Sequence, residues 1–503
     1  MASSLLRNSP TKSSYFIERW SSAATRLGVD RKFRPVSRWP YRRVGTVEVW
    51  LHSATFNQKS ALGINRLFEM SARSRNLADL FNLAMSAGDL RGPLILVLQS
   101  FLLRRTLLHA KTYARYYGSR SIYRDAIESA LESPLHACPT INRQTVAENF
   151  SEFLASDVVP RSVCHTSGTT GQPLEVYKSY EEVDFVYKFY SRLFSPVLAA
   201  MASRPLTVSF PTPHHGVPVP MPSPGFAFIS GVMDDTLIQD AVRVLKQKYE
   251  IPGHDSRISI LSGMAFQVLF FTSYLLEQKI DPSDFRLNAV NIAGGFVPTH
   301  WRRFLKRNWN AQINDRFSLT ESLAGASRCQ ECEWFKPDPH LIAETVDVDT
   351  GQPVQQGIGR LVITDLYPFV QMQPLIRYET GDLVESRVCS CWPLPVLRFL
   401  GREKNAISSK RGGERRRWLI FSSELYEFLA TLPDLRVYDW FSNVRVARDR
   451  TVGSLPLVSV KSTLSQDGKI KITLSAELKY APHCYPERVA DLRNQILHHL
   501  AVC

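Results

Sequence analysis

The sequence lacks the long apolar runs that membrane-spanning helices need. Its longest apolar stretch, Gly92 to Leu103, is interrupted by Gln99 and Ser100, whereas a bilayer span requires about 20 apolar residues. We therefore expect a buried helix there and no transmembrane segment. The sequence also shows no apolar core of a secretory signal, so a cytoplasmic location is expected.

Cysteine is scarce as well, with 8 residues among 503, which argues against a disulfide framework. Two pairs lie close in sequence, Cys329 with Cys332 and Cys389 with Cys391. In a reducing compartment such pairs hold metal more often than they form bridges. Reduced thiols without a metal are the alternative.

Acidic residues are few near the N-terminus. Residues 1–50 contain 10 Lys and Arg against 3 Asp and Glu, and about half of the net charge of +14 therefore lies in this segment. An organelle transit peptide has such a composition, but we favour a basic surface or docking segment. The remaining chain is nearly balanced in charge, which disfavours nucleic-acid binding.

The length predicts two or three domains. Residues 60–155 have helical periodicity, and after Val158 strand-like and helical stretches alternate, which predicts an α/β fold with largely parallel sheets. Two strands joined by a Gly/Pro turn over residues 340–366 predict an added antiparallel element. Near the C-terminus we expect, in order, a helix at 422–432, strands at 436–446 and 468–478, and a final helix at 487–502.

A run of small residues, Thr166-Ser167-Gly168-Thr169-Thr170-Gly171, has the composition of a phosphate-binding turn. Glycine-rich turns with Ser and Thr let N–H and hydroxyl groups converge on phosphate oxygens. No Gly-Lys-Ser/Thr follows, so it is not a P-loop. Taken alone, such a run is more often a plain loop.

Three further stretches change this interpretation: Thr320-Glu321 after an aromatic residue, Asp382 in a tight Thr-Gly-Asp turn, and Gly401-Arg402 near a domain boundary. In this order and spacing the four stretches resemble the motifs of adenylate-forming enzymes, the superfamily of acyl-CoA synthetases, luciferases and peptide-synthetase adenylation domains. The resemblance is closest to the phenylacetate–coenzyme A ligase branch and covers about residues 90–430.

The resemblance implies a large multi-layered adenylate-forming domain at 89–400, with parallel-rich sheets and a β element. It also implies a small α+β lid domain at 401–503, and residues 1–88 would be a basic extension, mostly helical or poorly ordered.

The resemblance further implies the ligands of ATP. Residues 166–171 would surround the β- and γ-phosphates, Gly294 and Gly295 would let the backbone approach the adenine, and Asp382 would accept hydrogen bonds from the ribose hydroxyls. Thr320 would contact the α-phosphate, and Glu321 would hold Mg2+, a cation that favours carboxylate oxygens. Arg402 would lie at the hinge of the lid.

The implied activity is that of an ATP-dependent ligase, which converts a carboxylic acid into an acyl-AMP and then a coenzyme A thioester. We expect an aromatic acid. Transfer to an acyl carrier protein or an amine is one alternative, and a degenerate nucleotide-binding relative without turnover is another. A dimer is compatible with the sequence.

Metal and substrate ligands complete the prediction. The phenylacetate–coenzyme A ligase branch implies a structural Zn2+ held by Cys332, His340, Cys389 and Cys391, with Cys329 as the competing ligand. His214 and His215 lie in a long loop after a strand, where the acyl pocket of such folds is built, and would bind the substrate; two solvated loop histidines are the alternative.

The sequence departs from the family pattern at several positions. Phe317-Ser318 stands where Tyr-Gly is usual, and Asn405 stands where the hinge usually has Asp. The family has a lysine after the last helix, whereas this sequence ends at "ILHHLAVC", and Lys469 lies before that helix. Adenylation is therefore expected to be slow, to use another cation, or to be lost. A basic loop, either at the phosphates of coenzyme A or merely solvated, contains Lys410, Arg411, Arg415, Arg416 and Arg417.

Overall fold

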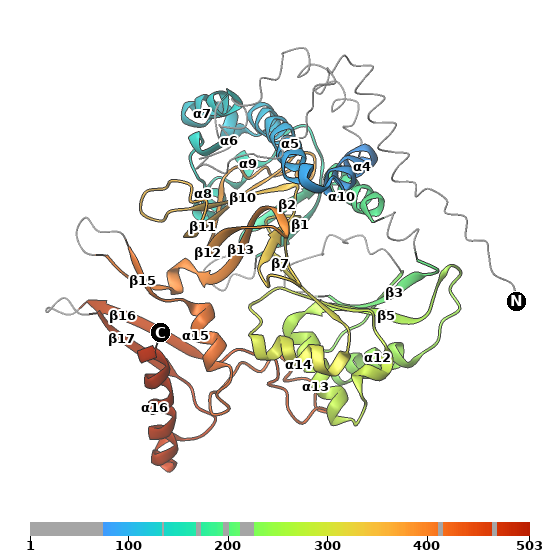
Figure 1. The fold of residues 1–503 in the computed structure, drawn as a ribbon, viewed down its shortest axis with the longest axis vertical. Helices are drawn as coiled ribbons and strands as arrows, with labels where there is room; N and C mark the ends of the chain where they lie inside the picture. The colour runs from blue at the N-terminus through green and yellow to red at the C-terminus, as the bar shows by residue number, and fades with distance from the viewer. Residues whose placement is uncertain are drawn as a thin grey trace, which may run out of the picture. The chain divides into compact units, whose positions relative to one another are not determined.

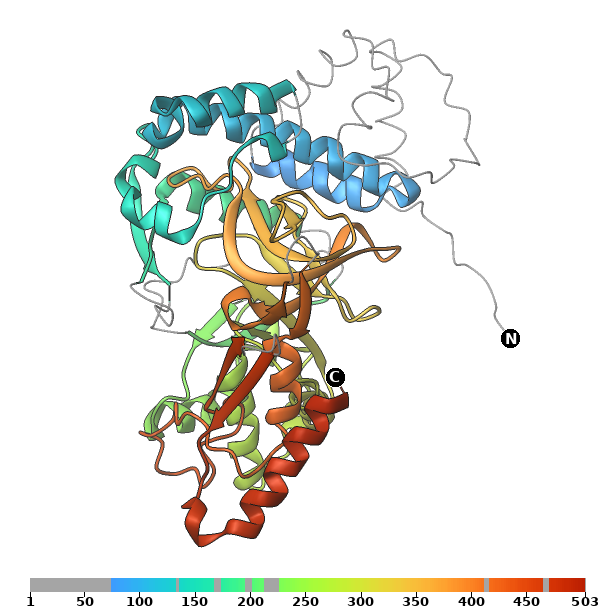
Figure 2. The ribbon, with the colours of Figure 1, turned by 90° about the vertical axis from the view of Figure 1, so that its left-hand side faces the viewer.

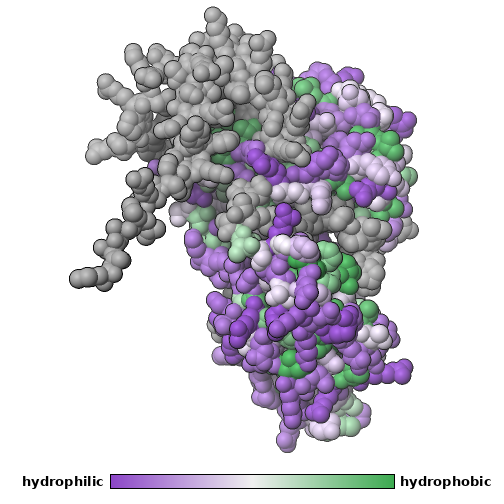
Figure 3. All heavy atoms as spheres, turned by 90° about the vertical axis from the view of Figure 1, so that its right-hand side faces the viewer, coloured by the Kyte–Doolittle hydropathy of each residue, from purple (hydrophilic) through white to green (hydrophobic). Residues whose placement is uncertain are grey.

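The computed structural model describes residues 74–132, 135–166, 173–194, 201–211, 226–410, 416–464 and 470–502. The chain divides into two compact units, 1–77 and 78–503, and nearly all described residues belong to the second. Within the described ranges, every helix is too short or too polar to cross a membrane. Where described residues form the surface in Figure 3, most of them are hydrophilic, with small hydrophobic patches between them.

The described part of the chain begins with helices, as the periodicity predicts. The long helix α5 (Arg91–Tyr113) contains the longest apolar stretch of the sequence. It is not wholly buried: Ile95, Leu98 and Leu102 face the protein, whereas Val97 is 42% exposed. The neighbouring helices are α4 (Ser74–Met85), α6 (Arg115–Ser119), α7 (Ser121–Glu132), α8 (Arg143–Glu148) and α9 (Phe150–Phe153).

An 11-stranded sheet forms the centre of the second unit, in the order β10-β11-β12-β13-β9-β8-β7-β6-β5-β3-β4 (Figure 1). Strands β4, β3, β5, β6 and β7 are parallel, and the pairs from β7 to β10 are antiparallel. The predicted α/β class with an added antiparallel element is therefore confirmed, but the prediction of largely parallel sheets is wrong. Four of the ten strand pairs in this sheet are parallel and six are antiparallel. The strands are β3 (Arg204–Phe210), β4 (Phe226–Ile229), β5 (His254–Met264), β6 (Ala289–Ala293), β7 (Gln312–Ser318), β8 (Gly325–Arg328), β9 (Phe335–Pro337), β10 (Leu341–Val346), β11 (Gly357–Asp365), β12 (Tyr378–Cys389) and β13 (Trp392–Arg402).

Helices cover the parallel half of this sheet. α12 (Asp235–Lys246), α13 (Ala265–Glu277) and α14 (Thr299–Trp309) follow β4, β5 and β6, and they lie side by side against the parallel strands (Figure 1). Apolar residues recur at helical spacing in α12 and α14, so each of these has one face to bury, whereas α13 is buried on most of its sides. These faces and the strands enclose one hydrophobic core, which includes Leu261 and Phe271.

The antiparallel half packs against the N-terminal helices. Its core joins Leu107 and Tyr117 from the helices to Ile363 and Leu397 from the strands. Beside it lies a two-stranded hairpin of β1 (Pro160–His165) and β2 (Glu175–Ser179), followed by α10 (Tyr180–Leu193).

The C-terminal region is a small α+β arrangement. Figure 2 shows its β-hairpin beside two helices, and Leu425, Leu429 and Leu492 form the core between them. A subdivision of the second unit at residue 401 stays a prediction. The elements are β14 (Ile407–Ser409), β15 (Arg417–Ile420), α15 (Ser422–Leu429), β16 (Val458–Leu464), β17 (Ile470–Ala476) and α16 (Pro486–Val502).

The predicted strand at 436–446 is wrong. This segment has no regular secondary structure beyond a single bridge, and residues 438–453, here called the strap, pack against α12 and α13. Phe441 stacks on Phe270 with ring centroids 3.8 Å apart, and Phe441 and Val444 belong to the core of the parallel half.

Two side-chain carboxylates accept hydrogen bonds from the backbone of the strap. Asp235 accepts hydrogen bonds from the backbone N–H groups of Arg445 and Val446. Glu277 accepts those of Arg448 and Asp449. These two acids tie the irregular segment to the start of α12 and the end of α13, while Phe441 and Val444 enter the main core.

Candidate active site

The motif residues follow neighbouring strands of the sheet. Gly294 and Gly295 come directly after β6, and Thr320 and Glu321 come just after β7. These strands are parallel neighbours. Because the carboxyl ends of parallel strands meet at one edge of a sheet, the glycine pair and the Thr-Glu pair lie at the same edge.

The two glycines have different reasons to be there. Gly294 has φ +69°, and a Cβ atom there would lie 2.3 Å from the terminal carbon of Met264. Gly295 has φ +148° and no heavy atom within 4 Å of an added Cβ. A side chain would therefore be strained at both positions, and the free space beside Gly295 suits the close approach of a ligand.

Glu321 is buried and held by a tyrosine. The hydroxyl of Tyr378 donates to Glu321 Oε1 at 2.9 Å, and burial, together with this carboxylate, raises the pKa of Tyr378. Thr320 beside it is half-buried. A carboxylate accepts several bonds, so Glu321 keeps acceptor capacity for a cation such as Mg2+.

Asp382 lies in strand β12 rather than in the predicted tight turn. Gly381 has φ +78°, and a register shift follows at Leu383, so the glycine bends the strand without ending it. The Asp382 carboxylate is 7% exposed, and its Oδ2 has no hydrogen-bond partner among the described residues. Burial raises the pKa of Asp382 to about 6, although Arg402 opposes the shift.

Arg402 lies opposite Asp382, at the end of β13. Its Nε is 3.4 Å from Asp382 Oδ1, and its Nη1 donates to the carbonyl of Thr380 at 2.6 Å. The predicted hinge residue and the predicted ribose ligand thus form one ion pair. An aspartate with one oxygen directed to Arg402 and one without a protein partner fits a ligand that brings hydroxyl donors.

Thr166 closes the base of the phosphate-binding run. It lies just after β1, its hydroxyl accepts the backbone N–H of Leu174 at 2.8 Å, and Arg143 Nη2 donates to the same oxygen at 2.7 Å. Arg143 also acts electrostatically on Tyr378, the partner of Glu321. The structure therefore adds a cation to the site that no motif predicted.

Several predicted ligands lie outside the described residues. These are Ser167, Gly168, Thr169, Thr170 and Gly171 of the phosphate-binding run, the substrate candidates His214 and His215, and Arg411 and Arg415 of the basic loop.

Two described residues of the basic loop, Lys410 and Arg416, are paired with an acid. Asp349 lies 3.0 Å from Lys410 Nζ and 2.9 Å from Arg416 Nη2.

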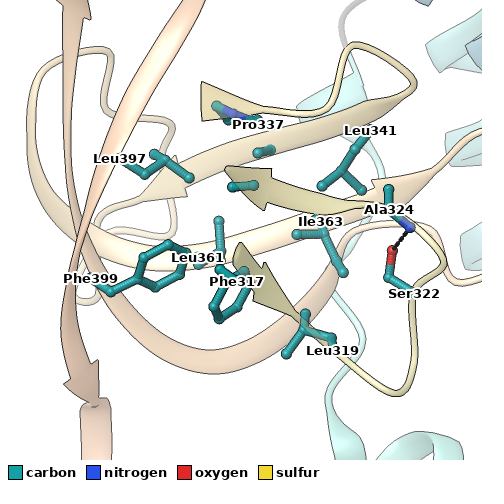
Figure 4. A pocket seen from close by; sticks show the side chains of 13 residues that line it. Phe317, Leu319, Ser322, Ala324, Pro337, Leu341, Leu361, Ile363, Leu397 and Phe399 are labelled. Atoms are coloured by element: carbon teal, nitrogen blue, oxygen red, sulfur yellow. Dashed lines mark hydrogen bonds between the residues drawn. The ribbon is translucent and has the colours of Figure 1, made fainter. Parts of the chain in front are cut away.

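Phe317, which replaces the usual tyrosine, faces the interior of the antiparallel half. Its ring stacks on Phe399 with centroids 3.9 Å apart. Both rings line a small cavity with Leu319 and Leu361 (Figure 4). The cavity measures about 10 Å³, which is room for one water molecule at most, so it is too small to be the acyl pocket.

The cysteine pairs meet at the far end of the β12–β13 hairpin. The Sγ atoms of Cys329, Cys332 and Cys391 all lie within 4.8 Å of one another, and Cys389 Sγ is 2.9 Å from Cys391 Sγ. Burial alone would raise the pKa of Cys329, but hydrogen bonds from the Cys332 backbone and the Lys336 ammonium lower it to about 6. Three thiols that approach one another in this way, with Cys389 beside one of them, are candidate ligands of a structural zinc ion.

His340 does not join this cluster. Its imidazole is buried elsewhere, stacked on Phe369 with centroids 4.3 Å apart and hydrogen-bonded through Nε2 with the Tyr190 hydroxyl at 3.2 Å. Burial lowers the pKa of His340 to about 4. His340 therefore lies apart from the thiols that approach one another, whereas Cys329, the competing candidate, lies among them.

Four side chains that contact the motif residues or their neighbours were not predicted from the sequence: Arg143, Lys178, Asp365 and Tyr378. Tyr378 stands four residues before Asp382, so its place in the motif could have suggested it. Lys178 lies at an inward position of a strand pattern, where a charged residue is unusual. Arg143 and Asp365 stand outside every motif and become visible only when the elements are packed.

Comparisons with known proteins agree with the motifs. No family model matches the chain. The curated phenylacetate-coenzyme A ligase of Thermus thermophilus is 24% identical over 237 residues, which is 45% of this chain and 50% of that protein. The match therefore spans only half the length of this curated relative.

Solved structures share the fold. An open conformation of 2-hydroxyisobutyryl-CoA ligase with 2-HIB-AMP and CoA has a TM-score of 0.57 at 15% identity, covering 82% of this chain and 85% of that chain. The same ligase in the postadenylation state with 2-HIB-AMP has a TM-score of 0.56 at 15% identity, covering 82% and 83%. The chain thus has the fold of these acyl-CoA ligases and, over 237 residues, is similar in sequence to a phenylacetate-coenzyme A ligase, in agreement with the resemblance seen in the motifs.

Proposed function

We propose that this protein is an ATP-dependent acid–thiol ligase that makes an acyl-AMP and transfers the acyl group to coenzyme A. The observation that carries the proposal is the cluster of Glu321, Asp382 and Arg402. It contains a buried aspartate oxygen without a partner among the described residues and a buried carboxylate suited to Mg2+.

Each residue has a chemical role in this proposal. The acid's oxygen attacks the α-phosphorus of ATP, a new P–O bond forms, and the bond to pyrophosphate breaks. Glu321 would hold the Mg2+ that neutralises charge on the phosphates, Thr320 would contact the α-phosphate, and Asp382 would accept from the ribose hydroxyls. Gly294 and Gly295 would border the adenine.

Arg143 and residues 166–171 complete the phosphate site. Arg143 donates to Thr166 at the base of the run, so its charge is close to the predicted position of the phosphates. In the second step the coenzyme A sulfur attacks the acyl carbon, the thiol proton is lost, and AMP leaves. Arg402 would lie at the hinge about which the lid rotates between the two steps.

An aryl acid is the first substrate class to test. The printed name of the curated relative, phenylacetate-coenzyme A ligase, supports it, whereas the structural neighbour's name indicates a small hydroxy acid. His214 and His215 are the proposed acyl-pocket ligands.

We further propose a structural zinc ion at Cys329, Cys332, Cys389 and Cys391. The mutual approach of these thiols supports it. This chemistry needs no zinc, so the ion would stabilise the end of the hairpin.

Pyrophosphate release tests the proposal. The protein is incubated with MgATP and a panel of aryl, hydroxy and fatty acids. Acid-dependent release supports adenylation, and its conversion into a thioester on adding coenzyme A supports the acceptor. If pyrophosphate is released but the acyl group is transferred only to a carrier protein or an amine, that acceptor replaces coenzyme A in the proposal. If the protein binds ATP but releases no pyrophosphate with any acid, a non-catalytic protein is favoured.

A further inference from the structure

Lys178 occupies a position where its strand calls for an apolar side chain. In β2 the alternate residues Val176 and Lys178 face inward and are buried, and Lys178 is only 2% exposed. Lysine is almost never fully buried unless it is paired, and an unpaired buried ammonium is strongly unfavourable. The partners of Lys178 therefore indicate why it is there.

Lys178 contacts two elements of the site. Its Nζ donates to the backbone carbonyl of Glu321 at 3.4 Å and lies 4.0 Å from Oε1 of Glu182, which is fully buried in α10. The other oxygen of Glu182 accepts the backbone N–H groups of Gln371 and Met372, both at 2.8 Å. The ammonium thus joins α10 to the turn that carries the Mg2+ candidate.

A second buried acid holds the same turn. Ser322 Oγ donates to Asp365 Oδ1 at 2.5 Å and accepts the N–H of Ala324 at 3.0 Å. The turn between β7 and β8 is therefore held at three points: by Lys178 at the Glu321 carbonyl, by Asp365 at the Ser322 hydroxyl, and by Tyr378 at the Glu321 carboxylate.

The charges make Lys178 central to this arrangement. Glu182, Asp365 and Glu321 are three buried acids, and the positive charge of Lys178 acts on both Glu182 and Asp365. Without it, neighbouring carboxylates in a medium of low dielectric would repel one another. The lysine thus both balances these acids and holds the peptide between Glu321 and Ser322.

We propose that Lys178 is a positioning residue for adenylation: by holding the Glu321 carbonyl beside two buried carboxylates, it keeps the Thr320–Glu321 turn in the shape that receives MgATP. The proposal rests on the proposed function. Lys178 touches no reacting atom in this role and acts through Glu321.

The test compares Lys178→Met with Lys188→Met. Lys188 is a matched control, because it is an exposed lysine on α10 paired with the acid four residues earlier, Asp184. ATP is titrated by calorimetry with and without Mg2+, and pyrophosphate release is followed against acid concentration. For Lys178→Met we expect the gain in ATP affinity due to Mg2+ to fall about tenfold and kcat to fall about 10²-fold. The KM for the acid should change less than about threefold, and Lys188→Met should match the wild type.

The double variant Lys178→Met with Glu182→Gln separates positioning from charge balance. It removes the lysine and one uncompensated acid together, and so provides a folded protein if the single variant does not fold. The proposal predicts that it keeps the Mg2+ defect. A double variant, or a folded single variant, with wild-type Mg2+ dependence and kcat would overturn it. If the wild type releases no pyrophosphate with any acid, the proposed function fails, but the Mg2+-dependent ATP titration still tests the lysine.

Discussion

The two ends of the β12–β13 hairpin differ in what their side chains face. At one end Asp382 pairs with Arg402 and keeps one buried oxygen without a partner among the described residues. At the other end, about 24 Å along the strand, Cys389 and Cys391 face Cys329 and Cys332.

We interpret the Asp382 end as a site that receives a ligand and the cysteine end as a structural cluster whose side chains face one another. The carboxylate end has acceptor capacity that the protein leaves unused, which is costly in a buried place unless a ligand uses it. The thiols of the cysteine end lie close to one another, and a zinc ion there would take thiolates as its ligands. The first end should therefore govern activity and the second stability.

Glu321→Ala should break the carboxylate end alone, with the largest effect. We expect acid-dependent pyrophosphate release to fall about 10³-fold, because the charge on the phosphates is no longer neutralised. The exposed acid Glu128 provides the control, and Glu128→Ala should retain wild-type release. Zinc content should stay unchanged in both. A loss smaller than about threefold would remove Glu321 from the proposed role.

Cys391→Ser should break the cysteine end alone. We expect the bound zinc to be lost, as measured by elemental analysis, and the melting temperature to fall by about 5 °C. The rate of pyrophosphate release well below that temperature should change little. Cys484→Ser is the matched control, because Cys484 is exposed and lies outside the cluster. Wild-type protein free of zinc would contradict the interpretation of this end.

Asp382→Asn tests how much the buried, ionised carboxylate of Asp382 lowers the free energy of unfolding. Burial raises the pKa of Asp382 to about 6, from about 3.9 in an unfolded chain. Between these values the folded protein binds more protons, so its stability falls as the pH rises through this window, by at most about 3 kcal/mol.

The Asp382→Asn side chain does not titrate in this pH range. The free energy of unfolding of this variant should therefore decrease less than that of the wild type as the pH rises. Urea unfolding at about pH 4 and about pH 7 measures it, and Asp284→Asn, at an exposed position, is the control. An unchanged difference between the two pH values would show that Asp382 is not the group concerned.

Tyr378→Phe should have the smallest effect of these variants, and it tests the carboxylate end at a single hydroxyl group. It removes one hydroxyl that holds Glu321 and keeps the ring in the core. We expect the affinity for MgATP to fall about tenfold, with little effect on ATP alone and none on zinc content. Equal losses with and without Mg2+ would indicate a role at the nucleotide instead of at Glu321.

The sequence predicted the parts of the site that depend on local spacing. The glycine pair after a strand, Thr-Glu after the next strand and Asp382 after Gly381 are local patterns. The first two lie at the same edge because β6 and β7 are parallel neighbours, whereas Asp382 lies in an antiparallel strand of the other half of the sheet. The parallel strands and their covering helices were also predictable, since each has its own apolar periodicity.

Contacts between distant segments were not predictable in this way. Lys178 meets Glu321 across 143 residues, and Arg143 meets Thr166 only after α8 and β1 pack together. His340 lies close in sequence to Cys332, yet its ring turns to the aromatic core, while Cys329 faces the thiols. The strap was mistaken for a strand because its apolar residues serve another core.

The strap has a thermodynamic consequence for the whole second unit. Its rings and carboxylate-bound amides connect the small C-terminal elements to the main core. Melting that core would release Phe441 and Val444, and with them the support of the segments that lead to α15 and β16. The free energies of the two regions are therefore coupled, and heating should produce one cooperative transition in place of two.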